Sequence, residues 1–581
     1  MSAPSPSTLV HALAALPRDE ARGFRFIGAD GAERFHSYAA LAAEAERRAA
    51  FLQKRLTLQK GERMALVIPD GEAFVLSMLG AIVAGVVPVP IFPRPAFKNA
   101  DHYREVVAHI VAASGAKHLL TSQAARQAAG LDALCAPGTG GPALQGIHDV
   151  ETFFAGAAPA FTPPTLTAAD LCFLQFTSGS TSMPKGVQVT HANLVANATA
   201  FLGPHGLCRR DDDLGVSWLP LYHDMGLIGF VLGTLICDIP VVLLPTERFA
   251  RMPRLWLETI SRYRGTITYA PNFAYELVTK RSRDKDLAAL DLRCLRIAGC
   301  GAEPVRARTL RAFADRFAAA GLRPEVLLPC YGLAEHTLAA TFPPLERGLA
   351  VDTVDSAALA QGWATPSTDR AASATAPHRS EIVGCGQAFP GHEVAILDAD
   401  GSPCAERQVG EIVLSGPSVT PGYFQNPAAS AASFRDGRLH TGDLGYKIGN
   451  ELFVCGRIKD LIVVRGANIH PQDIEWTAGD VDGVRRGNVV AFSTITGGEE
   501  RVVVLAEATA AAAHDVAQAV RAAIIQNHGI EPDHIGIVAL GALPKTSSGK
   551  AQRRKTKALF EAGQLPEHPQ QPAPATAESN R

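Results

Sequence analysis

Residues that could bind a polyphosphate are concentrated in one short stretch of the chain. From Thr177 to Lys185 the sequence reads TSGSTSMPK, with hydroxyl side chains at five of nine positions. Such a loop can surround phosphate oxygens with N–H and O–H donors, and Lys185 adds positive charge. Gly179 allows the backbone to approach closely. The pattern differs from GxxxxGK[ST], because Lys185 precedes its glycine. A flexible linker has a similar composition, so the stretch needs partners elsewhere.

Five other stretches contain residues whose side chains could take part in binding or catalysis. They are Ser217–Gly226, Gly301–Pro304, Tyr331–His336, Thr441–Asp443 together with Gly456–Asp460, and Pro544–Lys550.

Each of these residues also has a plain structural interpretation. Glu335 could be a carboxylate at a helix N-terminus, and Tyr331 a core aromatic residue. Thr-Gly-Asp can be a simple turn, whereas Arg457 and Lys550 could lie on the surface. The His223-Asp224 pair could relay a proton or bind a metal, but no second histidine at ligand spacing supports a metal. A serine hydrolase is excluded by the absence of a nucleophile elbow.

The first half of the chain predicts a parallel sheet covered by helices, because strands alternate with helices. Helices are expected at 37–56, 74–84, 103–113, 191–202, 226–237, 252–263, 272–280 and 304–319. Strands are expected at 64–68, 86–91, 118–121, 171–176, 214–218, 240–244, 266–269, 294–299 and 324–328.

The pattern changes from about Glu381, where short strands and turns indicate antiparallel hairpins and a small barrel-like part. A second unit begins near Gly456, with strands at 461–465, 488–493, 501–507 and 535–540, a helix at 513–527 and a lysine-rich loop at 544–555. The fold class is therefore α/β, with a small α+β domain at the C-terminus. The low-complexity composition from residue 566 predicts a disordered tail.

Composition excludes several classes of function. The net charge of −2 gives no sign of nucleic-acid binding. The ten cysteines show no metal-ligand spacing, which favours reduced thiols in a cytoplasmic protein. Two apolar stretches, 74–92 and 226–245, are interrupted by Gly, Pro or Asp, and each is read as a helix followed by a buried strand rather than a membrane span.

Taken together and in this order, the six stretches resemble the motifs of the adenylate-forming superfamily, which includes acyl-CoA synthetases, luciferases and peptide-synthetase adenylation domains. The resemblance implies that a carboxylate attacks the α-phosphate of ATP, releasing pyrophosphate and forming an acyl adenylate. It further implies that Thr177, Ser178, Gly179, Ser180, Thr181 and Lys185 hold the leaving phosphates.

The resemblance also implies roles for the other motif residues. Glu335 would bind Mg²⁺, and Lys550 would bridge the carboxylate and the α-phosphate. His223 would orient the acyl carboxylate, and Lys459 would be the hinge of a mobile C-terminal domain. The base and ribose would be held by Gly301, Ala302, Glu303, Tyr331, Gly332, Leu333, Ala334, Asp443 and Arg457. Met225, Ile228 and Phe273 are candidates for the acyl pocket.

Within that superfamily the chain is most similar to fatty acyl-AMP ligases, because an added segment at about 343–380 carries VDSAALAQG. This resemblance implies a fatty acid substrate and transfer to the phosphopantetheine thiol of an acyl carrier protein. A long-chain acyl-CoA synthetase is the main alternative, followed by amino-acid adenylation and an inactive scaffold. Cys300 and His336 depart from the expected motif residues. The expected organisation is an AMP-binding domain at 1–455, a mobile domain at 456–565 and a tail at 566–581.

Overall fold

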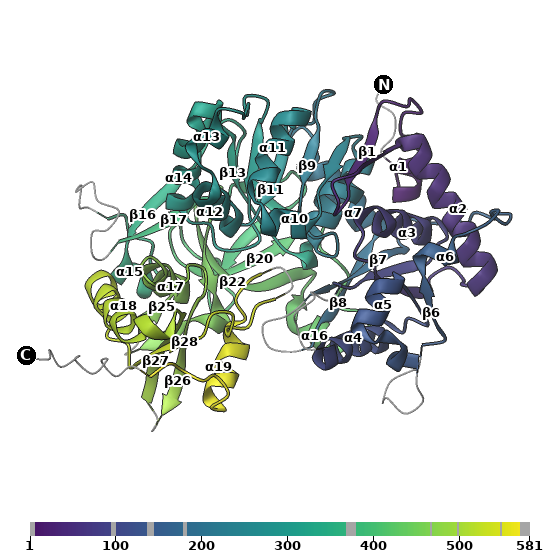
Figure 1. Ribbon diagram of the computed structural model, residues 1–581. Coiled ribbons are helices and arrows are strands. Elements are labelled where there is room, and N and C mark those ends of the chain that lie inside the picture. The colour runs from purple at the N-terminus through teal and green to yellow at the C-terminus, as the bar shows by residue number, and fades with distance from the viewer. Residues whose placement is uncertain are drawn as a thin grey trace, which may run out of the picture.

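The structure is a computed structural model with a large body and a smaller C-terminal subdomain that packs against one side of it (Figure 1). It describes residues 6–93, 100–135, 144–177, 183–367, 379–464, 467–496, 499–546 and 549–569. The predicted α/β class is confirmed, since the body holds two sheets built mainly from parallel strands and covered by helices.

The largest sheet has seven strands in the order β13-β12-β11-β9-β10-β1-β2. Its strands are β1 (Gly23–Ile27), β2 (Glu33–Ser37), β9 (Gly215–Ser217), β10 (Val241–Leu243), β11 (Ile267–Ala270), β12 (Ile297–Cys300) and β13 (Leu327–Pro329). All pairs are parallel except β1 with β2, a hairpin that the sequence did not reveal. Parallel strands end at one edge, so residues following β9, β11, β12 and β13 are brought together there.

Helices that follow these strands begin at the same edge. They are α8 (Asp224–Leu227), which continues as a π-helical turn (Ile228–Leu232) and α9 (Gly233–Ile236), and then α10 (Thr246–Arg251), α11 (Arg254–Tyr263), α12 (Asn272–Arg281) and α14 (Ala307–Phe317). The predicted helix at 252–263 is α11, and α10, which lies before it, was not predicted. Pro253 separates the two helices, because it cannot supply a backbone N–H to a continuous helix.

The second parallel sheet has the order β4-β3-β5-β6, formed by β3 (Arg63–Val67), β4 (Val87–Pro90), β5 (His118–Thr121) and β6 (Gly146–Asp149). Its helices include α2 (Tyr38–Leu56), α3 (Gly71–Val83) and α4 (Ala100–Ser114). The apolar α3 is buried against α2, where Gly80 lies so close that a Cβ would sit 2.6 Å from Cβ of Arg48. Within the described residues, none of the helices has the length and apolar character needed to cross a bilayer.

The two ends of the phosphate-loop candidate, Thr177 and Lys185, lie on paired strands. Strand β7 (Leu171–Thr177) pairs antiparallel with β8 (Lys185–Thr190), and Thr177 faces Lys185 across the pair. The strand β8 was not predicted, although Val187 and Val189 alternate as buried residues. The predicted helix is confirmed as α7 (His191–Leu202), with a capping box at Thr190 and Asn193.

Antiparallel strands follow β13, as predicted. The main sheet of this part contains β19 (Glu393–Leu397), β20 (Gly410–Ser415), β21 (Phe434–Arg435), β22 (Arg438–Ile448) and β23 (Glu451–Arg457). A smaller sheet contains β14 (Tyr331–Gly332), β15 (Ala339–Phe342) and β18 (Gln387–Ala388). The added segment forms a hairpin of β16 (Val351–Asp355) and β17 (Arg379–Val383), with α15 (Ser356–Ala360) after β16.

The C-terminal subdomain holds a three-stranded sheet, β26-β27-β28, a separate two-stranded sheet, β24-β25, and helices. Its elements are β24 (Ile462–Val464), β25 (Ala467–Ile469), α17 (Pro471–Gly479), β26 (Val489–Thr496), β27 (Glu499–Glu507), α18 (Ala513–His528), β28 (His534–Val538) and α19 (Arg553–Glu561). Helices α17 and α19 were not predicted. The expected tail differs as well, because Glu567 pairs with Val538 and the His568 N–H donates to the carbonyl of Ile537, so ordered packing continues past residue 566.

A buried ion pair ties together the beginnings of three strands in the large sheet. Asp213, before β9, accepts hydrogen bonds from Arg296, before β12, and from Thr266, before β11. The Arg296 side chain is only 8% exposed. Removing one partner of such a pair leaves an uncompensated buried charge.

We therefore predict that Asp213→Ala lowers the free energy of unfolding by about 3–5 kcal/mol. The midpoint of denaturant unfolding measures the loss. Asp132→Ala, which removes the 67% exposed partner of Arg126, is the control and should change the midpoint little. Equal effects of the two substitutions would contradict this account of the sheet.

Candidate functional site

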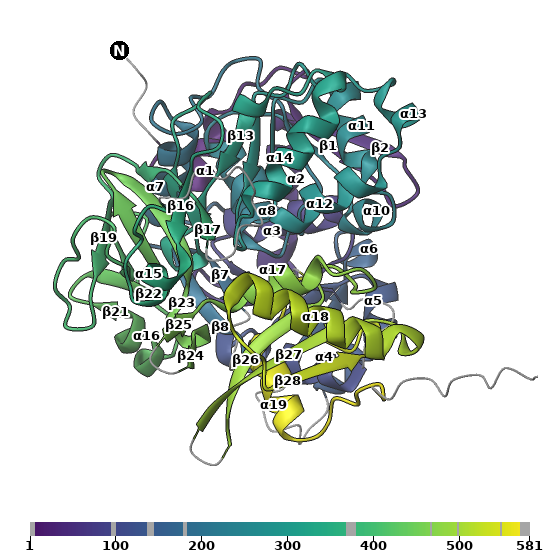
Figure 2. The ribbon, with the colours of Figure 1, turned by 90° about the vertical axis from the view of Figure 1, so that its left-hand side faces the viewer.

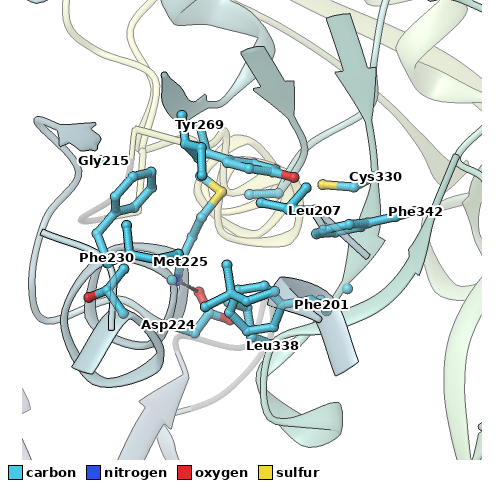
Figure 3. A pocket seen from close by; sticks show the side chains of 18 of the residues that line it. Phe201, Leu207, Gly215, Asp224, Met225, Phe230, Tyr269, Cys330, Leu338 and Phe342 are labelled. Atoms are coloured by element: carbon cyan, nitrogen blue, oxygen red, sulfur yellow. Dashed lines mark hydrogen bonds between the residues drawn. The ribbon is translucent and has the colours of Figure 1, made fainter. Parts of the chain in front are cut away.

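An apolar cavity of about 60 Å³ opens at the carboxyl edge of the large sheet (Figure 3). Its walls come from α7, α8 and the π-helical turn after it, from β11, and from the segment 330–342. Asp224, Ala302, Tyr331 and Gly332 line it together with buried apolar side chains such as Phe230. The cavity therefore brings together residues from three of the predicted stretches.

Asp443 is the centre of a hydrogen-bonded group beside this cavity. Its Oδ2 accepts a 2.7 Å hydrogen bond from the Tyr331 hydroxyl, and its Oδ1 accepts a 2.6 Å bond from Nε of Arg457. Asp443 and Arg457 face each other across β22 and β23. Because the Tyr331 hydroxyl is already bonded, the face of its ring is the part that can meet a ligand.

Glu335 forms a second group, next to the β7–β8 hairpin. One carboxylate oxygen accepts a 2.8 Å hydrogen bond from the Tyr423 hydroxyl, and Nζ of Lys185 lies 5.0 Å from the centre of the Tyr423 ring. Burial raises the pKa of Glu335, and the Tyr423 hydrogen bond partly offsets this. Among the described residues, no three His, Cys, Asp or Glu side chains gather as a metal centre. Glu335 is thus suited to Mg²⁺ held mainly by ligand phosphates, which needs only one or two carboxylates.

Glu303 and its neighbours close the other side of the site. The Glu303 carboxylate accepts a 2.7 Å hydrogen bond from the N–H of Phe273, at the start of α12. Ala302 has a φ of +69°, a conformation uncommon for residues other than glycine. A Cβ on Gly301 would lie 2.7 Å from Sγ of Cys330, so the chain passes closely there.

Lys550 reaches this site from the C-terminal subdomain. Burial, together with the positive charge of Lys550, lowers the pKa of His223 to about 3. Burial raises the pKa of Asp224 and of Glu303, and Lys550 partly offsets both effects. Lys550 therefore lies near all three groups, although its residue is exposed and comes from a separate part of the chain.

The remaining residues that were predicted for the site lie in different parts of the structure. Gly332 passes so close to Leu338 that a Cβ would be 2.0 Å from its carbonyl oxygen, and Leu333 and Ala334 lead directly to Glu335. Met225 lines the cavity, whereas Ile228 is fully buried and the Phe273 ring packs edge-on against Trp218. Lys459 lies in a short 3-10 turn between β23 and β24. Ser178, Gly179, Ser180 and Thr181 fall outside the described residues.

Several residues of the site were not predicted from the sequence. Tyr423 belongs to none of the six stretches, and no spacing connects it to Glu335. Asn197, on α7, donates to the carbonyl of Ala339 and to Oγ of Ser418 and accepts from the N–H of Ala339, which fixes the loop that carries Glu335. Asn193 and Asn197 are four residues apart and share a helix face, a signal that could have identified them.

Comparison with known proteins identifies the family. The profile of the AMP-binding enzyme family matches residues 17–424, and a profile described as Disco-interacting protein 2-like, AMP domain, matches residues 459–570. The chain belongs to the AMP-binding enzyme family, as the sequence motifs predicted.

Three similar proteins are informative. A "Putative acyl-CoA synthetase" of Caulobacter vibrioides is 39% identical over 87% of this chain and 86% of its own length. A medium-chain fatty acid–acyl carrier protein ligase of Teredinibacter turnerae is 32% identical over 85% of this chain and 84% of its own. A solved structure from a study of fatty acyl-adenylate ligases of E. coli and L. pneumophila has a TM-score of 0.85 and 34% identity, covering 96% of this chain and 98% of that one.

The electrostatic effect of Lys550 can be tested directly. Lys550→Ala should raise the pKa of His223 from about 3, because a nearby positive charge is lost. NMR titration of ¹³C-labelled histidines measures the change. Lys545→Ala is the matched control in the same loop, since it removes a lysine charge that affects the pKa of Glu303. An unchanged His223 titration in Lys550→Ala would remove Lys550 from this site.

The same shift has a consequence for stability. The pKa of His223 in the fold is below its ordinary value of 6.5, so the unfolded chain binds this proton more readily. The contribution to stability is therefore present above pH 6.5 and is lost as the pH falls toward 3.

Proposed function

We propose that this protein uses ATP to activate a fatty acid as a fatty acyl adenylate, and then transfers the acyl group to the phosphopantetheine thiol of an acyl carrier protein. The observation that carries the proposal is the junction of an apolar cavity with the Tyr331–Asp443–Arg457 group, because it suits an acyl chain joined to a nucleotide. The names of the ligases described above support a fatty acid substrate and a carrier-protein acceptor.

In the first step, a carboxylate oxygen bonds to the α-phosphorus and the bond to pyrophosphate breaks. Two anions must meet, so positive charge has to lie where they react. Lys550 would neutralise the carboxylate and the α-phosphate, and the β7–β8 hairpin with Lys185 would hold the leaving phosphates. Mg²⁺ bound at Glu335 would supply further positive charge to those phosphates.

Binding and orientation fall to the remaining residues. The Tyr331 ring would stack on adenine, and Asp443 and Arg457 would hold the ribose. His223, which is neutral over the physiological pH range because of its low pKa, would orient the carboxylate rather than act as an acid.

In the second step, the thiol sulfur of the carrier bonds to the acyl carbon and AMP leaves with the former carboxylate oxygen. The thiol proton passes to solvent. We propose that the C-terminal subdomain, from about residue 456, turns about Lys459 between these steps. Asp460, the last residue of the turn that holds Lys459, forms an ion pair with Arg553 of α19.

We expect the position of the C-terminal subdomain to be restrained, in part by the added hairpin. In α17, which lies at the boundary of the two parts (Figure 2), Asp473 takes a hydrogen bond from Ser380 of β17. Arg306, at the start of α14, pairs with Asp480 at 2.6 Å and lies over the Trp476 ring. These contacts and the name of the Teredinibacter relative favour the carrier-protein acceptor over the alternative, a long-chain acyl-CoA synthetase.

The acceptor experiment supplies ATP, Mg²⁺ and a panel of fatty acids with either CoA or a phosphopantetheinylated carrier protein. We expect acyl-AMP to accumulate with CoA and to be consumed with the carrier. Rapid acyl-CoA formation would overturn the carrier assignment.

Lys550→Ala tests the first step. We expect acyl-AMP formation to fall by roughly 10²–10³-fold or more, while ATP binding by calorimetry is retained, because the transition-state charge loses its main partner. Lys557→Ala, an exposed lysine of α19, is the control. Unchanged adenylation in Lys550→Ala would refute its assigned role.

The contact between β17 and α17 should depend on pH. Burial raises the pKa of Asp473, and the hydrogen bond with Ser380 partly offsets this effect, so that the pKa is about 7. The contact is therefore favoured at low pH and weakens as the pH rises through about 7. Hydrogen exchange of β17 and α17 measures this, and Asp473→Asn should remove the pH dependence. Asp482→Asn, at a nearby exposed position, is the control. A pH dependence that persists in Asp473→Asn would contradict the prediction.

A further inference from the structure

The apolar cavity contains a polar group that has no partner. The hydroxyl of Tyr269, on β11, is buried and forms no hydrogen bond within the described part of the chain. The residue is 8% exposed and lines the cavity. Figure 3 shows its ring across the cavity, with the hydroxyl oxygen on the side of Cys330. A buried hydroxyl without a partner is destabilising, so its presence requires an explanation.

We propose that the cavity takes a carboxylic acid whose chain carries an oxygen, and that Tyr269 hydrogen-bonds to this oxygen. This inference rests on the proposed function and narrows its substrate class. A hydroxyl, ether or carbonyl group within the chain would satisfy Tyr269, whereas a plain alkyl chain would leave it unpaired.

The Tyr269 ring is held rigidly, so its hydroxyl has a fixed position. The ring stacks on Phe342 at 5.9 Å and meets Phe230 edge-on at 6.4 Å. It also lies directly on Gly299, where a Cβ would be 2.0 Å from a ring carbon. Without a side chain at Gly299 the ring can occupy this place. A preorganised donor of this kind loses little entropy when a ligand binds.

Other polar groups in the cavity do not satisfy Tyr269. The Thr234 hydroxyl donates to the carbonyl of Val231 at 2.9 Å, which uses its hydrogen within its own helix. Burial raises the pKa of the Cys330 thiol to about 12, so the thiol remains neutral and is a weak hydrogen-bonding group. One oxygen of Asp224 accepts from the N–H of Met225.

Water is a poorer explanation than a ligand oxygen. The cavity is large enough for water, but a buried water needs two to four polar partners to be held. The walls around Tyr269 are mostly aliphatic and aromatic. A ligand oxygen needs only Tyr269, because the rest of its chain gains from apolar contacts.

The test compares the straight-chain saturated acid that the protein adenylates best with its monohydroxy positional isomers. The readout is kcat/KM for acid-dependent exchange of pyrophosphate into ATP. One isomer should exceed the plain acid by roughly tenfold, the net value of one hydrogen bond in a buried site.

Tyr269→Phe should abolish this preference by weakening use of the hydroxy acid and improving use of the plain acid. Because the substitution removes only an unpaired hydroxyl, the variant should fold with an unchanged or higher Tm. Tyr446→Phe is the matched control, since it removes a buried hydroxyl that donates to Asp352 in another sheet. It should lower Tm and leave the preference intact.

Two results would overturn the inference: no isomer is preferred over the plain acid, or the preference persists in Tyr269→Phe. Failure of the proposed function is distinguishable, because then no acid supports exchange in the wild-type protein. In that case, calorimetric binding of the same acids to wild type and Tyr269→Phe decides the inference by itself.

Discussion

The two oxygens of Asp443 connect segments that are far apart in the chain. One accepts from Tyr331, which follows the last strand of the large parallel sheet, and the other accepts from Arg457, the last residue of β23. The chain enters the C-terminal subdomain just after Arg457. The group therefore lies where the segment after the parallel sheet meets the antiparallel sheet, just before the chain enters the C-terminal subdomain.

Charge in the site is divided between these parts. Asp224, Glu303 and Glu335 are carboxylates whose pKa values are raised by burial, and all three belong to the large body. Lys550 comes from the C-terminal subdomain and acts on two of them. In the proposed reaction, the balance of charge is complete only when the subdomain is in this position. A carboxylate and a phosphate could then approach each other without uncompensated repulsion.

Much of the fold was predictable because the parallel strands are short buried runs between amphipathic helices. The strands that were missed have other causes. In β8, Lys185 and Gly186 resemble a loop, and its identity as a strand depends on pairing with β7. Helix α19 carries the run RRKTK, which resembles a solvated loop until Arg553 pairs with Asp460 and Glu475. Such contacts depend on tertiary structure and leave no local period in the sequence.

The site residues, like the elements of the fold, were only partly predictable from the sequence. Tyr331, Glu335, Asp443 and Arg457 lie in recognisable stretches, and the structure brings them to one edge. Tyr423 and Tyr269 could not be identified from the sequence. Tyr423 is important because it contacts Glu335, which is far along the chain. Tyr269 is important because its hydroxyl has no hydrogen-bond partner within the described residues. The positions of Ile228 and Phe273 likewise follow from packing, which places one in the core and the other against Trp218.

Isotope transfer can show whether a carboxylate oxygen of the substrate attacks the α-phosphate of ATP. The protein is supplied with a fatty acid labelled with ¹⁸O in its carboxylate, together with ATP, Mg²⁺ and the acyl acceptor. If the carboxylate oxygen attacks the α-phosphate, the AMP released after transfer contains one ¹⁸O atom, which mass spectrometry detects. AMP without the label, or ADP as the product, would contradict this attack.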